Sequence, residues 1–165
     1  MLYSTKRLEN PRTASAPSKN LSKSAGALVC ALAILPMNAL AVCNDALFCT
    51  ALGTTALFSN TTGAFNTASG FEALVSNTEG SGNTANGAGA LRSNTTGFSN
   101  TASGASSLYS NTTGSNNTSS GARALRSNTT GYGNTASGAS ALFSNTTGYG
   151  NTASGGGTLF FNITG

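Results

Sequence analysis

One leucine recurs every 17 residues through most of the chain, while the positions around it are small or polar. The row comprises Leu57, Leu74, Leu91, Leu108, Leu125, Leu142 and Leu159. The unit reads G-x-x-A-L-x-S-N-T-T-G-x-x-N-T-A-S, and six full units and a partial seventh fill residues 53–165 without insertion or deletion. An unbroken period indicates that each unit stacks on the next in one orientation, as in a solenoid.

The composition of the unit favours β-structure, because Asn, Thr and Gly are poor helix formers. We therefore predict an all-β parallel β-solenoid (a β-roll) in which each 17-residue unit forms one coil. The A-L-x-S and N-T-A-S segments are predicted as its two short strands. The N-T-T-G and S-G-x-x segments are predicted as turns, because Asn and Gly tolerate positive φ. The leucine and the second alanine of each unit are expected to face the core.

Asparagine recurs with the same period, in a row that we predict to form a hydrogen-bonded ladder between coils. Its members are Asn60, Asn77, Asn94, Asn111, Asn128, Asn145 and Asn162, and a second asparagine row begins at Asn66. One leucine and one alanine per coil bury too little surface to offset the entropy cost of ordering the coil. The ladder and the association of several chains are the two expected sources of the missing stability.

The N-terminal residues contain the three parts of a secretory signal. Residues 1–23 are polar and basic, residues 25–35 are an uncharged apolar run, and an A-x-A motif ends at Ala41. We predict a signal helix and cleavage after Ala41. A membrane anchor is an alternative, because the mostly apolar stretch 25–42 approaches the length of a membrane span; lipidation of Cys43 is a minor one. The proline and asparagine inside this stretch favour the cleaved signal.

Two cysteines follow the predicted cleavage site, Cys43 and Cys49. In an oxidising compartment two remaining cysteines most simply pair, and we predict a disulfide between them. A metal site would need more ligands than the nearby Asp45 supplies. The predicted organisation is a signal peptide at 1–41, an N-terminal cap segment at 42–52 and a β-solenoid domain at 53–165.

Charged residues make up 7% of the chain, against about a quarter in ordinary globular domains, and there is no histidine. Acid–base catalysis and metal binding need convergent His, Asp, Glu or Cys side chains, so we expect neither an enzyme nor a cofactor or metal. The net charge of +4 comes from the N-terminal segment, because three arginines and three acidic residues after residue 41 sum to zero. Without a basic footprint, nucleic-acid binding is not expected.

Residues 141–155, ALFSNTTGYGNTASG, resemble the ALYSNTTGNNNTAxG-type repeats of bacterial surface proteins and tail fibres. They are similar to the head repeats of YadA-like trimeric autotransporter adhesins, whose units are shorter. The resemblance covers residues 53–165 and implies a left-handed β-roll in a homotrimer. It also implies secretion or display at the outer membrane, and binding to a host extracellular-matrix protein or glycan.

The expected function is therefore an exported adhesin-like module that meets the membrane only through its signal segment. Two alternatives stay open: an ice-binding or ice-nucleating solenoid, because threonine rows on a flat β-face can order water, and a truncated, non-functional adhesin fragment. The three arginines of the repeats form either a small basic patch for acidic glycans or a solvated face. The aromatic residues after the leucine either contact a ligand or pack between protomers, and we expect packing; they are Phe58, Tyr109, Phe143 and Phe160.

Overall fold

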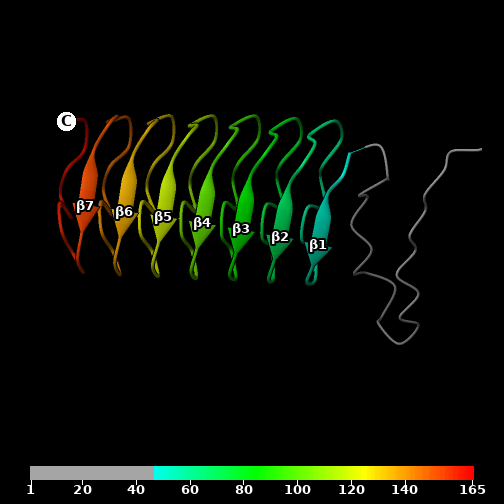
Figure 1. Ribbon diagram of the computed structural model, residues 1–165, viewed down its shortest axis with the longest axis horizontal. Helices are drawn as coiled ribbons and strands as arrows, with labels where there is room; N and C mark the ends of the chain where they lie inside the picture. Colours follow the sequence, from blue (N-terminus) through cyan, green and yellow to red (C-terminus); the bar gives the residue numbers. More distant parts are fainter. Residues whose placement is uncertain (1–46) are drawn as a thin grey trace, which may run out of the picture.

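A computed structural model describes residues 47–165, and all regular elements in this part of the chain are short parallel β-strands (Figure 1). They are β1 (Thr50–Leu52), β2 (Thr67–Ser69), β3 (Thr84–Asn86), β4 (Thr101–Ser103), β5 (Thr118–Ser120), β6 (Thr135–Ser137) and β7 (Thr152–Ser154). The strands form one sheet in chain order, and Thr50 pairs with Thr67 in the register that every later coil repeats. The predicted β-solenoid of 17-residue coils is confirmed. The predicted signal helix, Ala41 and Cys43 lie outside the described residues.

The prediction of a second strand at A-L-x-S is wrong, because this segment forms a turn in each described coil. Ala90 and Leu91 are consecutive and both are fully buried, whereas a pleated strand sends neighbouring side chains to opposite faces. Leu91 has a φ of 52°, in the left-handed region. This conformation costs a non-glycine residue about 1–2 kcal/mol, but it turns the chain so that both side chains enter the core. The five other buried leucines share it.

The core consists of stacked rows of leucine and alanine. The leucine side chains from Leu57 to Leu142 are 0% exposed, with two rows of alanine packed beside them. The core therefore holds two alanines per coil, one more than expected. Leu159 departs from the prediction and is 46% exposed, because it lies in the last described coil.

Two buried serines replace alanine at one level of the core. Ser107 and Ser119 are both 0% exposed. The Ser107 hydroxyl donates to Ser119 Oγ at 2.6 Å, and the Ser119 hydroxyl donates to the Ala124 carbonyl at 2.9 Å. A buried hydroxyl without a partner would be costly. The core tolerates the pair because the Ser107 hydroxyl donates to Ser119 and the Ser119 hydroxyl donates to a backbone carbonyl.

The asparagine row that begins at Asn60, the first ladder, is hydrogen-bonded from coil to coil. Asn94 Nδ2 donates to Asn77 Oδ1 of the preceding coil at 2.8 Å and to the Gly97 carbonyl of its own coil at 2.9 Å. The same pair of bonds recurs from Asn77 to Asn162. Each amide thus joins two coils and also closes its own turn.

The row that begins at Asn66 forms a second ladder. The backbone N–H and the Nδ2 of Asn100 both donate to Asn83 Oδ1, at 3.0 and 3.1 Å. The two ladders meet at one carbonyl per coil, because the Gly97 oxygen accepts from Asn83 Nδ2 and Asn94 Nδ2, at 2.8 and 2.9 Å. Within residues 47–165, each buried side-chain nitrogen or oxygen has a hydrogen-bond partner.

Two glycine rows are required by this stacking. A Cβ at Gly97 would collide with the Gly114 carbonyl oxygen and with Asn94 Oδ1, where the ladders meet. Gly104 has a φ of 133°, which side chains rarely permit, and a Cβ there would lie 2.7 Å from the Gly121 carbonyl oxygen. The close approach of neighbouring coils therefore explains the glycine at position 97. At Gly104 both the close approach and the positive φ require glycine.

Cys49 takes the place of a second-ladder asparagine at the N-terminal end of the described coils, because it lies 17 residues before Asn66. Its Sγ lies 3.4 Å from the Gly63 carbonyl oxygen and 3.9 Å from Asn60 Nδ2. Since Cys43 lies outside the described residues, the disulfide stays a prediction.

Replacing a central ladder asparagine should destabilise the rod. Asn128→Ala removes the donor to Asn111 Oδ1 and leaves Asn145 Nδ2 without one of its two acceptors. An unsatisfied buried polar group costs about 1–3 kcal/mol, so the free energy of unfolding should fall by at least that amount in urea titrations followed by circular dichroism. The neighbouring Ser127→Ala is the control and should change it by less than about 0.5 kcal/mol. Equal effects of the two variants would contradict the role of the ladder.

Candidate functional site

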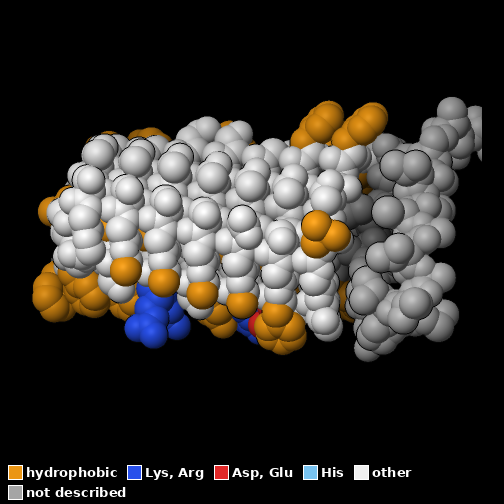
Figure 2. Space-filling view, turned by 60° about the horizontal axis from the view of Figure 1, so that its bottom comes forward, with side chains coloured by type: hydrophobic (Ala, Val, Ile, Leu, Met, Phe, Trp, Pro, Cys, Tyr) orange, Lys and Arg blue, Asp and Glu red, His pale blue; other side chains and the backbone are white. Residues whose placement is uncertain are grey.

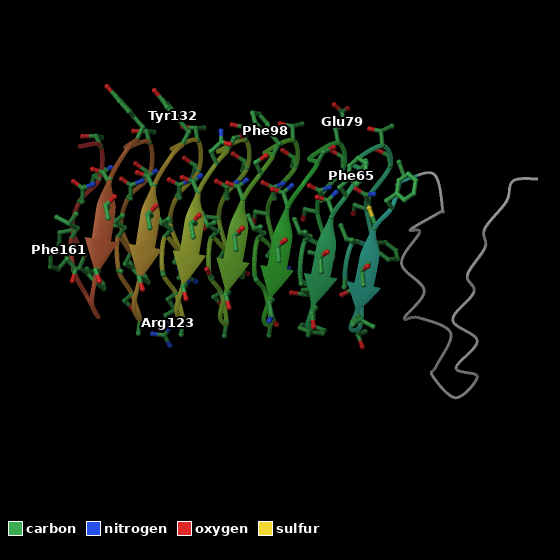
Figure 3. The ribbon with its side chains drawn as sticks, in the orientation of Figure 1. Phe65, Glu79, Phe98, Arg123, Tyr132 and Phe161 are labelled. Atoms are coloured by element: carbon green, nitrogen blue, oxygen red, sulfur yellow. The ribbon has the colours of Figure 1, made fainter. Side chains whose placement is uncertain are left out.

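Functional side chains of the described coils lie in rows along the rod, because the 17-residue register superimposes equivalent positions (Figure 3). No three His, Cys, Asp or Glu side chains gather within residues 47–165. None of these residues belongs to a helix long and apolar enough to cross a membrane. The candidate sites are therefore the outward rows of the coils.

The first surface, the hydroxyl face, is the outer side of the sheet. In each strand from β2 to β7 the middle residue is buried and the two flanking residues point outward. The outward residues are Thr67, Thr84, Thr101, Thr118, Thr135 and Thr152 in one row, and Ser69, Asn86, Ser103, Ser120, Ser137 and Ser154 in the other.

The hydroxyl face is a regular two-dimensional array. Stacked strands lie about 4.8 Å apart, and side chains two residues apart on one strand lie about 7 Å apart. The paired strands keep both rows in register along the rod. No residue of β1 to β7 is charged, and Figure 2 shows a broad uncharged face with basic side chains gathered along one long edge.

The second surface is an arginine–aromatic column, formed by the residues that follow the leucine in successive coils: Arg92, Tyr109, Arg126, Phe143 and Phe160. The Arg126 guanidinium lies 5.2 Å from the centre of the Tyr109 ring and 5.7 Å from that of the Phe143 ring. The Phe143 and Phe160 rings stack with centroids 4.7 Å apart. The aromatics expected to pack between protomers thus stack along a single chain, except Phe58, which is 66% exposed.

The three arginines differ in their electrostatic partners. Arg92 Nε donates a hydrogen bond to Glu72 Oε2 at 2.7 Å. This hydrogen bond raises the pKa of Arg92 above its usual value. Arg123 and Arg126 share one turn, in which the backbone N–H of Arg126 donates to the backbone carbonyl of Arg123 at 3.3 Å. Neither has an acidic partner within residues 47–165. Glu79, the other acid there, lies at the opposite long edge from Arg123 (Figure 3).

That opposite edge carries exposed aromatic side chains that the sequence analysis did not single out. Tyr132 and Tyr149 stack with ring centroids 5.0 Å apart, and Phe98 is 52% exposed. Each directly follows the glycine of an N-T-T-G turn, which is the signal that could have identified them.

No protein family, curated protein or solved structure matches this chain. The resemblance of its repeats to adhesin heads therefore remains an expectation from the motif alone.

Charge substitutions at two neighbouring positions test the inside and the outside of the coil. Leu108 is 0% exposed, and an unpaired carboxylate there should destabilise the rod by more than about 4 kcal/mol. Tyr109 lies between the guanidinium groups of Arg92 and Arg126, which can receive a carboxylate. Far-UV circular dichroism should therefore show unfolding of Leu108→Asp and a folded Tyr109→Asp. The reverse result would invert the assignment of the two faces.

Proposed function

We propose that this chain is an exported, adhesin-like binding rod, displayed at the bacterial surface or secreted, that attaches to host matrix or to other cells. The observation that supports this proposal is the repetition of one outward threonine row over seven strands in one register. Identical side chains on a stiff support can each make a weak contact, and simultaneous engagement of many contacts yields a high avidity.

The assignment of residues within the coil also favours a binding rod over an enzyme. Apart from Ser107, Ser115 and Ser119, the buried polar side chains of the described coils are the ladder asparagines, and the hydrogen bonds of their amides join neighbouring coils. Only five charged side chains occur in residues 47–165, and two of them pair with each other. These coils thus lack the convergent acid and base groups that most hydrolytic chemistry needs.

Assembly into a homotrimer is part of the proposal and comes from the resemblance to adhesin heads. An exposed apolar row beside the turn with Arg123 is suited to side-by-side packing of rods, because exposed apolar stripes favour association. Its members are Phe71, Ala88, Ala105, Ala122 and Ala139.

Shortening the rod in register tests the multivalent function. Deletion of residues 104–120 removes one 17-residue unit and should leave a folded rod, whereas deletion of residues 104–119 breaks the register and should unfold it. Binding to immobilised matrix proteins, glycans and cells should weaken several-fold for each unit removed in register, because avidity falls with the number of contacts. Light scattering on the same samples should give the mass of a trimer. Unchanged binding after in-register deletions, or a lack of binding to all of these surfaces, would reject the proposal.

The hydroxyl face favours a second candidate, an ice-binding or ice-nucleating solenoid. Its array of threonine methyl and hydroxyl groups is uncharged and regular in two directions, so it can hold water molecules in a repeating arrangement.

Lysines on this face should abolish ice binding. Thr101→Lys/Thr118→Lys places two charges on the central strands, while Thr113→Lys/Thr130→Lys is the matched control at a turn position where Glu79 already occurs. In ice-affinity partitioning, the first variant should stay in the liquid and the second should be recovered in the ice. An unmodified chain that stays in the liquid would exclude this candidate.

A further inference from the structure

Two arginines of one coil have no neutralising acidic partner among the described residues of a nearly uncharged rod. Arg123 and Arg126 lie three residues apart in one turn, and neither meets a carboxylate within residues 47–165. Like charges repel each other, and the only other arginine of these residues, Arg92, is paired with Glu72. The turn is therefore a local site of positive charge that an anion would stabilise.

The Arg126 side chain is preorganised for an anion. The Tyr109 and Phe143 rings lie on either side of its guanidinium, 5.2 and 5.7 Å from its central carbon. Its N–H donors lie in the guanidinium plane. Among the described arginines, only the Arg92 side chain donates a hydrogen bond to a protein group. The donors of Arg126 are thus held in place at little further entropic cost and are open to a ligand.

Hydroxyl groups flank the same turn. Ser106 and Ser140 are the register neighbours of Arg123, one coil before and one coil after it. Both are half-buried, and their side chains make no hydrogen bond to the described residues. They are suited to the hydroxyl groups of a sugar, whereas the guanidinium groups are suited to its charge.

We infer that Arg123 and Arg126, with Ser106 and Ser140, bind carboxylate groups of an acidic polysaccharide built from hexuronate units. A planar guanidinium matches a carboxylate with two parallel hydrogen bonds. A nucleic acid would require a much wider basic surface than two arginines. The inference rests on the proposed function and names the ligand class of the binding rod.

Binding of the full chain to immobilised polygalacturonate tests the site, with the fully methyl-esterified polymer as the uncharged control ligand. The chain should bind the acid and not the ester, and added salt should weaken binding. Arg123→Gln/Arg126→Gln should weaken it at least about tenfold, because each hydrogen bond to a charged group contributes on the order of a factor of ten. Arg92→Gln, the control with its charge already paired, should weaken it about twofold or less.

The chemistry of the site is tested by Arg126→Lys, which keeps the charge but loses the planar pair of donors. Because lysine cannot match a carboxylate with two parallel hydrogen bonds, this variant should bind polygalacturonate about tenfold more weakly.

The inference would be overturned by equal effects of Arg92→Gln and the double variant, or by binding of the ester. Equally tight binding of single-stranded DNA or anionic lipid vesicles would also overturn it. If the unmodified chain fails to bind polygalacturonate, and it and the double variant bind matrix equally well, only the inferred arginine site is rejected. Failure of all attachment would reject the proposed function itself.

Discussion

The hydrogen bonds between stacked asparagine amides are the interaction on which the rest of the rod depends. Each first-ladder amide reaches one coil back and also closes its own turn, and the second ladder meets it at a shared glycine carbonyl. A one-residue insertion would move every later asparagine away from its partner, and unsatisfied buried amides are costly. This explains why the 17-residue period runs without interruption.

The ladders also explain why so thin an apolar core suffices. The coil closes around leucine, two small residues and two asparagines, and the described buried polar atoms all have partners. In such a core the leucine must turn inward beside a buried alanine, and its left-handed backbone is the local cost of that arrangement. Glycine is required where the coils approach most closely.

Because these constraints act on the interior, the outward rows are free to differ from coil to coil. The position after the leucine holds phenylalanine, valine, arginine or tyrosine, while the leucine before it recurs in all seven coils. The same register brings any outward residues into stacks, so that Arg126 lies between two rings. The hydroxyl face and the arginine–aromatic column are consequences of one stacking rule. The binding functions proposed for the hydroxyl face and for the turn with Arg123 and Arg126 use its regular spacing.

The sequence alone determined the period, the β-class, the leucine row and an asparagine ladder, because periodicity is a property that can be read along the chain. It also places Cys43 and Cys49 one repeat length before Asn60 and Asn66 along the chain. Only the tertiary structure decided that the A-L-x-S segment is a turn, that both asparagine rows meet at one carbonyl, and that the arginines differ in their partners. The direction of a side chain depends on φ, and its partners depend on the next coil; residue type and spacing encode neither.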